Sequence, residues 1–214
     1  DAQVGDDFQI NPEQIELRYF GVLTKIFNVG RFASQFDFDG DLDKVPDNLE
    51  NEDKWILAEF TDLLEKSKEG YSNLDIYTAA QGIKTFSTGL FASHWLEMAK
   101  TRLYNEDASA TWTLHRIFRD LLSILSPICP FFTHHLSTTL YEKSSVEVDI
   151  FPSSPLTKTD EWTKLTDSLV EFNSIIWKAK KDEGISLAAP LSGQKVPEEL
   201  SIISEALVSM HKLE

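Results

Sequence analysis

Five residues near the start of the chain have side chains suited to contact an unpaired nucleic-acid strand. A helix turns by about 100° per residue, which places Lys25, Asn28 and Phe32 on one stripe, with Arg18 earlier on it and Arg31 at its edge. Cations contact phosphates or base edges, asparagine pairs with an adenine edge, and an aromatic ring stacks on an unpaired base. The stripe predicts an RNA-contacting face; a solvated helix face whose Phe32 is covered by a loop is the alternative.

The rest of this segment predicts one long helix that holds the stripe. Asn11 is suited to cap it and Pro12 to occupy its first position, where a missing N–H costs nothing. We expect the helix to run from Pro12 to Ser34. Its apolar residues fall on the side away from the stripe and are expected to face the core: Tyr19, Phe20, Val22, Leu23, Ile26, Phe27 and Val29.

The charge of the chain is strongly negative but unevenly spread. The formal net charge of −15 by itself disfavours nucleic acid, because a binding face must neutralise phosphates. However, eight acids stand against Lys44 alone between positions 37 and 53, whereas the segment 12–35 carries three cations against two acids. The segment 162–181 has four lysines against two acids. A local face that binds a polyanion is therefore compatible with the overall charge.

Helical periodicity dominates the remaining sequence. Apolar residues recur at three- and four-residue spacing, as in Leu114, Ile117, Leu121 and Leu125. Gly70 is expected to end the second helix, and Gly82 and Gly89 are expected to mark close contacts between helices. Beyond the first helix, the pattern predicts helices over 49–67, 73–104, 109–126, 131–141 and 160–182 and a last one at the C-terminus.

The predicted fold class is all-α or mainly α. We expect a connector over 1–11, a helical bundle over 12–144, and a small C-terminal α or α+β appendage over 145–214. The alternating "SVEVDIFP" of 145–152 predicts an extended strap at its start. The chain does not begin with Met, and we expect it to be a piece of a longer polypeptide.

Two features predict the compartment. No apolar run approaches the roughly 20 residues that span a bilayer, so we expect no membrane partner. Cys129 is the single cysteine, which excludes a disulfide within the chain and favours a reducing compartment. A cytoplasmic location is the simplest expectation.

Other residue clusters predict no chemistry of their own. His134 and His135 are adjacent, and neighbours in a helix point about 100° apart, so no metal site is predicted there. His94 and His115 are expected to be satisfied core or rim residues. The acidic run 37–53 lacks the glycine and glutamate spacing of a calcium loop. No glycine-rich phosphate-binding loop occurs in the sequence.

Four blocks of the sequence, taken in order, resemble the anticodon-binding helical domain of class Ia aminoacyl-tRNA synthetases. "VGDDFQINPEQIELRYFGVLTKIFNVGRFA" is similar to the family's Gly-x-Asp element and its Lys-x-x-Asn-x-x-Arg-Phe helix. "LLSILSPICPFFTHHL" is similar to its Pro-x-x-Pro-Phe helix pair, and "SVEVDIFP" to the extended segment that follows. "KDEGISLAAPL" and the Lys before Asn are most similar to archaeal-type valyl-tRNA synthetase. The second of the four blocks in chain order, "FASHWLEMAKTRLY", is similar to a family helix and matches it at Trp95, Glu97, Lys100, Arg102 and Tyr104.

The resemblance implies what the stripe contacts. Lys25, Asn28, Arg31 and Phe32 would meet the anticodon loop of a valine-accepting tRNA, whose central base is adenine. Asn28 would pair with that adenine, Phe32 would stack, and the two cations would contact phosphate or base. Arg18 is added from the helical wheel alone. The same domain of an isoleucyl- or leucyl-tRNA synthetase, or a protein-interaction module without RNA, are the alternatives.

The resemblance also implies that this chain is part of a longer ligase, which would join valine to its tRNA with ATP and Mg. The catalytic domain of that ligase would be a partner of this chain. The family's catalytic motifs are absent here, so we expect this chain alone to be non-catalytic. Lys178, Lys180 and Lys181 near the end of the helix 160–182 are a second, weaker candidate for contact with the RNA backbone. The acidic run 37–53 is expected to lie away from the RNA.

Overall fold

The computed structural model describes residues 12–15, 20–141, 151–156 and 159–214. Within these residues the regular elements are helical, and Leu191 and Leu213 pair in an isolated β-bridge. None of the described helices is long and apolar enough to cross a membrane. The elements are α1 (Pro12–Ile15), α2 (Gly21–Ala33), α3 (Asn51–Ser72), α4 (Ile76–Thr85), the π-helix η2 (Phe86–Trp95), α5 (Leu96–Tyr104), α6 (Ala108–Leu125), α7 (Pro130–Tyr141), α8 (Asp160–Thr163), α9 (Thr166–Asp182), the 3₁₀-helix η3 (Glu198–Ile203) and α10 (Ser204–His211).

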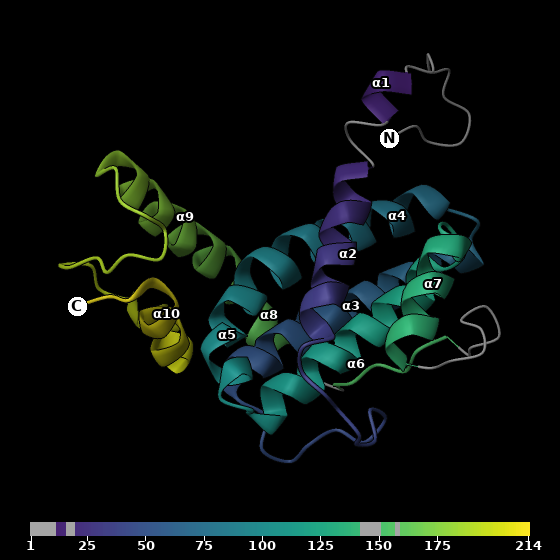
Figure 1. Cartoon of the computed structure of the whole chain (residues 1–214), viewed down its shortest axis with the longest axis horizontal. Coiled ribbons are helices and arrows are strands. Elements are labelled where there is room, and N and C mark those ends of the chain that lie inside the picture. Colours follow the sequence, from purple (N-terminus) through teal and green to yellow (C-terminus); the bar gives the residue numbers. More distant parts are fainter. Residues whose placement is uncertain (1–11, 16–19, 142–150, 157–158) are drawn as a thin grey trace.

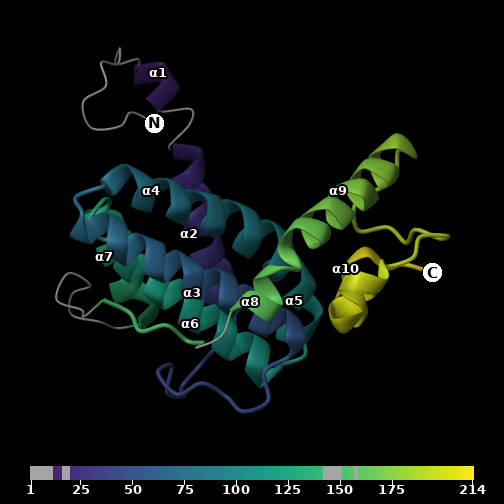
Figure 2. The ribbon, with the colours of Figure 1, turned by 180° about the vertical axis from the view of Figure 1, so that it is seen from behind.

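Helix α6 is largely buried and packs against α2, α3, α5 and α7 (Figure 1). Its predicted apolar spacing is confirmed, because Leu114, Ile117 and Leu121 are buried. Asp107 starts the helix, since its carboxylate accepts a hydrogen bond of 2.8 Å from the backbone N–H of Ala110. Seen from behind, α3 and α4 lie side by side across the bundle (Figure 2).

The expectation that Gly70 ends the second helix is wrong, because α3 continues to Ser72. Gly70 is buried inside the last turn, and the two residues that follow it, Tyr71 and Ser72, are still helical. A Cβ on Gly70 would lie 3.0 Å from the carbonyl oxygen of Asp75. The Gly70 carbonyl in turn accepts the Asp75 N–H at 2.8 Å. Glycine is needed here for the close return of the chain rather than for a left-handed end.

The predicted long helix 73–104 is present as α4, η2 and α5 in succession, with a π-helical middle. Gly82 marks a close helix contact as expected, because a Cβ there would lie 3.1 Å from Leu63. The same expectation for Gly89 is wrong, since nothing lies within 4 Å of its ideal Cβ. Gly89 instead falls within η2, where the wider helix changes the direction of the side chains.

The C-terminal helices stand beside the bundle, with α8 against α3 and α10 against α5 (Figures 1 and 2). The predicted helix 160–182 is interrupted at residues 164–165, between α8 and α9. The C-terminal helix is confirmed and is preceded by η3. The expected connector 1–11 and most of the expected strap 145–152 lie outside the described residues, and the bundle and appendage limits stay predictions.

Asp53 joins α3 to three other helices of the bundle, η2, α5 and α6. Its buried carboxylate accepts hydrogen bonds from Trp95 Nε1 at 3.0 Å, Arg102 Nη2 at 2.7 Å and Ser109 Oγ at 2.6 Å. Arg102 also pairs with Glu52 and Asp107, at 2.8 and 2.9 Å. These contacts hold the end of α5 against the first turns of α3 and α6.

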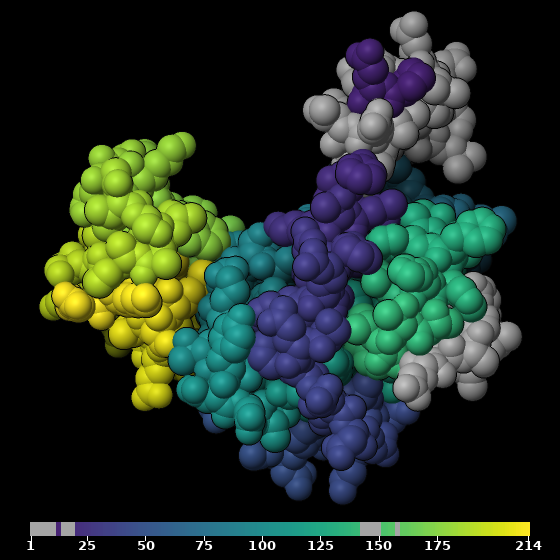
Figure 3. Space-filling model, in the orientation of Figure 1, coloured from purple at the N-terminus to yellow at the C-terminus, as the bar shows by residue number. Residues whose placement is uncertain are grey.

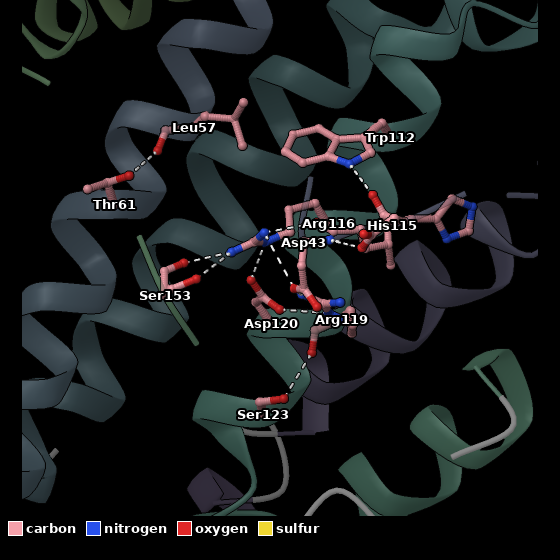
Figure 4. A network of polar contacts seen from close by, with 12 residues as sticks. Asp43, Leu57, Thr61, Trp112, His115, Arg116, Arg119, Asp120, Ser123 and Ser153 are labelled. Carbon is pink, nitrogen blue, oxygen red and sulfur yellow. Dashed lines mark hydrogen bonds and ion pairs between the residues drawn. The ribbon is translucent and has the colours of Figure 1, made fainter. Parts of the chain in front are cut away.

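A second network fixes the acidic loop that follows α2 (Figure 4). Arg116 of α6 is buried and donates to the carbonyl oxygens of Leu42 at 2.8 Å and Ser153 at 2.6 Å. Arg119 pairs with Asp43 at 2.7 Å. The carboxylate of Asp120 forms ion pairs with both guanidinium groups, at 2.6 Å from Arg116 Nε and 2.8 Å from Arg119 Nε. The loop is therefore anchored to α6 through its backbone as well as its charges.

Candidate nucleic-acid interface

The exposed face of α2 is rotated from the stripe that periodicity predicts. Phe20 is 68% exposed and Phe27 is 37% exposed, so their assignment to the core is wrong. Ile26, Val29 and Gly30 are buried as expected. With about 100° per residue, the exposed face is displaced by about 70° from the predicted stripe. The exposed residues are Phe20, Gly21, Thr24, Phe27, Asn28, Arg31, Ser34 and Gln35.

The rotation follows from how α2 is packed. One side of the helix lies on η2, and the other lies on α6 and α7. A Cβ at Gly30 would be 3.0 Å from the ring of Phe118 and 3.5 Å from Leu136. This close approach places Gly30 on the buried side, against α6 and α7. Phe20 and Phe27 are apolar but lie outside the buried side.

Asn28 and Arg31 are the two predicted site residues that remain open to solvent on α2. They are three positions apart, so they are neighbours on one helix face. An amide and a guanidinium placed this way can read a base edge and hold a phosphate. Phe27 lies beside them on the same face and offers an exposed aromatic ring.

Lys25 is turned toward the bundle rather than toward solvent. Its Nζ donates a hydrogen bond to the carbonyl oxygen of Thr88 and another to Ser93 Oγ at 2.8 Å. Ser93 Oγ also donates to Thr88 O at 2.9 Å. Burial lowers the pKa of Lys25, an effect that the charge of Glu97 opposes. In this arrangement the ammonium secures α2 to the π-helical turn of η2.

Phe32 is half-buried in a cluster of three aromatic rings. Its ring centroid lies 4.9 Å from that of Phe36 and 6.1 Å from that of Tyr104, both in edge-to-face geometry. Tyr104 at the end of α5 is 62% exposed. The sequence predicted a stacking role for Phe32 but assigned none to Tyr104. The contact between them could not be predicted, because the two residues belong to helices far apart in the sequence.

A groove of about 620 Å³ lies between α2 and α5 on one side and the C-terminal helices on the other. Figure 3 shows α2 and the C-terminal part on either side of this region. Its charged lining comprises Lys25, Lys100, Lys212 and Glu97, and Trp177 contributes an aromatic wall. Lys100 Nζ forms an ion pair of 2.6 Å with Glu97, which balances these two charges. Lys25 and Lys212 therefore give the lining a net positive charge. A basic groove beside an aromatic ring suits a single nucleic-acid strand.

The second predicted lysine cluster is divided by the structure. Lys178 and Lys181 are exposed on α9, as an RNA contact requires. Lys180 is fully buried and donates to the carbonyl oxygens of Leu187 at 2.8 Å and His211 at 2.7 Å, and to a third at Ala189. The prediction that Lys180 contacts RNA is therefore wrong, because its ammonium is used inside the fold. Arg18 lies outside the described residues.

His94 and His115 serve packing within the described part of the chain. His115 is buried and donates from Nε2 to the carbonyl oxygen of Phe36 at 2.6 Å. His94 is buried and accepts a hydrogen bond of 2.8 Å from the Asn173 amide. Both expectations for these residues are confirmed. Within the described ranges, no three His, Cys, Asp or Glu side chains gather in a way that could hold a metal ion.

Comparison with known proteins identifies the family of this bundle. A family model described as the anticodon-binding domain of tRNA ligase matches residues 53–195, more than half of the chain. The valine–tRNA ligase of Sulfolobus acidocaldarius is 34% identical over 194 residues, which is 90% of this chain and 23% of the relative. The valine–tRNA ligase of Nanoarchaeum equitans is 28% identical over 100% of this chain, and that of Aeropyrum pernix is 32% identical over 99% of it. Each alignment covers 27% of the relative.

The chain thus spans about a quarter of the length of these relatives. The family model begins at Asp53, after α2, whereas the relatives align with nine-tenths or more of the chain. The helical fold, the order of the sequence motifs and the matching family model all indicate the same family. The chain belongs to the family of anticodon-binding domains of tRNA ligases.

Proposed function

We propose that this chain reads the anticodon loop of a valine-accepting tRNA as one part of a valine–tRNA ligase. The observation that carries the proposal is the exposed pair of Asn28 and Arg31 on α2, at motif positions of the family. Asn28 lies one turn after Lys25, which lines the basic groove. The names of the archaeal relatives support valine as the amino acid. The net charge of −15 does not oppose it, because the cations that line the groove are gathered locally.

Each exposed group has a chemical part in this function. The Asn28 amide can pair with the edge of the central adenine through two hydrogen bonds. Arg31 can hold a phosphate or a base edge, and unpaired loop bases have open faces on which aromatic rings can stack. Lys25 would contribute its positive charge from the side of the groove while it stays bound to η2.

The remainder of the longer ligase would carry the chemistry. There, ATP with Mg would supply the activation of valine, and the activated valine would pass to the end of the tRNA. The contribution of this chain is positional, because contacts to the correct anticodon hold the far end of the tRNA in the catalytic site. We expect the ligase to act in the cytoplasm, where its tRNA substrate is used.

A salt-dependent titration tests the proposal. The chain is titrated with valine-accepting tRNA at about 50 mM and about 200 mM salt, where counterion release weakens phosphate-dependent binding steeply. We expect binding at low salt that the double variant Asn28→Ala, Arg31→Ala reduces by at least tenfold. Lys68→Ala removes an exposed cation from α3 and is the control, which should bind as the wild type does. Absent binding, or equal binding by the double variant, would overturn the proposal.

A further inference from the structure

Tyr104 is the exposed member of the aromatic cluster that contains Phe32 and Phe36. Tyr104 is 62% exposed, whereas the two phenylalanines are half-buried. The Tyr104 centroid lies 5.5 Å from Phe36 and 6.1 Å from Phe32, with interplanar angles of 66° and 88°. Edge-to-face contacts of this kind favour a particular ring orientation. The cluster therefore supports the ring of Tyr104 while leaving much of it in contact with solvent.

The backbone beneath Tyr104 is held in place by ion pairs. Arg102, two residues earlier, pairs with buried Asp53 at 2.7 Å and with Asp107 at 2.9 Å. Asp107 also accepts the Ala110 N–H that begins α6. The junction of α5 and α6 is thus tied on both sides of Tyr104. An aromatic side chain presented by a fixed backbone loses little conformational freedom when a ligand binds.

The position of Tyr104 relates the groove to the exposed face of α2. Tyr104 lies one helical turn after Lys100, so the two share a face of α5, and Lys100 lines the groove. Tyr104 also contacts Phe32, which lies one helical turn after Asn28 on α2. A strand whose phosphates follow the lysines of the groove would bring its bases toward this ring.

We propose that Tyr104 is a base-stacking residue for one unpaired nucleotide of the tRNA anticodon loop. The proposal rests on the proposed function and adds a contact on α5 to those on α2. Every base has a π-face, so this contact supplies affinity for any unpaired base, whereas Asn28 supplies selectivity. Phe131 of α7 is 91% exposed and gives a matched aromatic control outside the cluster.

A fluorescent stem-loop RNA tests this contact. 2-Aminopurine is placed in turn at each unpaired position of the valine anticodon loop, and its quenching on stacking is followed in titrations with the chain. We expect one position to be quenched by the wild type and by Tyr104→Phe, but not by Tyr104→Ala or Tyr104→Leu. The leucine variant keeps an apolar group against Phe32 and Phe36, so its result separates stacking from packing. Tyr104→Ala should weaken binding by about 5- to 150-fold, and Phe131→Ala should bind as the wild type does.

The two proposals fail in different ways. Unchanged affinity and quenching in Tyr104→Ala and Tyr104→Leu, together with lost binding in Asn28→Ala, Arg31→Ala, would overturn the stacking role alone. Absent binding of the stem-loop by the wild type, or binding that neither set of variants changes, would overturn both. Equal losses in Tyr104→Ala and Phe131→Ala would show a general effect of exposed aromatics and would also overturn the stacking role.

Discussion

Asn173 of α9 and His211 of α10 share a buried hydrogen bond of 2.7 Å, in which His211 Nε2–H donates to the amide oxygen. The amide nitrogen of Asn173 donates to His94 Nδ1 in η2 at 2.8 Å. This accepting nitrogen is unprotonated, so His94 must be neutral for the bond to form. One buried amide thus joins the C-terminal helices to the bundle and borders the region where the groove lies.

Acid is expected to weaken this junction. Burial, with the nearby charge of Lys180, lowers the pKa of His211 to about 4, and burial with the charge of Lys25 lowers the pKa of His94. In the unfolded chain these rings take up protons near the ordinary value of 6.5, so their contribution to stability is complete above that pH and is lost as the pH falls toward 4.

Urea unfolding at several pH values measures this effect. His211→Gln should be less stable than the wild type at neutral pH, and the difference in free energy of unfolding should shrink between pH 6.5 and 4. Comparing the two proteins removes the contribution of carboxylates, which titrate in both. A difference that stays constant across this pH range would contradict the neutral state of His211.

Removing the charge of Arg102 should destabilise the bundle strongly. Arg102→Ala leaves the carboxylate of Asp53, which is fully buried, without its cation. Breaking a buried pair from one side typically costs about 3–5 kcal/mol. The control is Lys100→Ala, because the Lys100–Glu97 pair is about 40% exposed, and such pairs contribute about 0–1 kcal/mol. Equal losses of unfolding free energy in the two variants would contradict the structural role of Asp53.

Two glycine substitutions should have opposite effects on stability. Gly30→Ala places a Cβ 3.0 Å from the ring of Phe118, and the overpacking should cost about 1–3 kcal/mol. Gly89→Ala meets nothing within 4 Å, and it restricts the unfolded chain, so it should be neutral or stabilising by up to about 1 kcal/mol. Thermal unfolding distinguishes these outcomes, and a stabilising Gly30→Ala would contradict the close contact of α2 with α6.

Substitutions of two neighbouring lysines of α9 should also differ in their effect on stability. Lys180→Met leaves carbonyl oxygens of Leu187, Ala189 and His211 without their buried donor, and each unsatisfied group typically costs about 1–3 kcal/mol. Lys181 is exposed, so Lys181→Met should change stability by less than about 0.5 kcal/mol. Hydrogen exchange of the segment 184–191 should accelerate in Lys180→Met alone. Unchanged exchange there would contradict the anchoring role of Lys180.

The helical bundle could be predicted from apolar spacing, because α6 is surrounded by other helices and its periodicity is strong. The orientation of α2 could not be predicted in the same way. Phe20 and Phe27 are apolar and were placed in the core, but both are exposed in the described part of the chain. Lys25 was placed outside, but η2 supplies a carbonyl and a hydroxyl that accept its ammonium.

The exposure of Asn28 and Arg31 could be predicted because one helix carries both residues, whereas contacts that several helices build were missed. Asn28 and Arg31 lie within one turn of each other, so a helical wheel can relate them. Tyr104 and Phe32 lie on different helices, so the contact between them depends on how α5 packs beside α2. Contacts between distant segments leave no periodic signal, which is also why the buried role of Lys180 was missed.

The most direct measurement of the central claim is the affinity of this chain for valine anticodon stem-loops that differ only in the central base. If Asn28 pairs with the adenine, replacing that base should weaken binding to the wild type by about 5- to 150-fold. Asn28→Ala should bind all loops equally, whereas Gln35→Ala, which removes an exposed amide in the turn after α2, should keep the preference. Equal affinity of the wild type for all central bases, or a preference that survives in Asn28→Ala, would contradict the account.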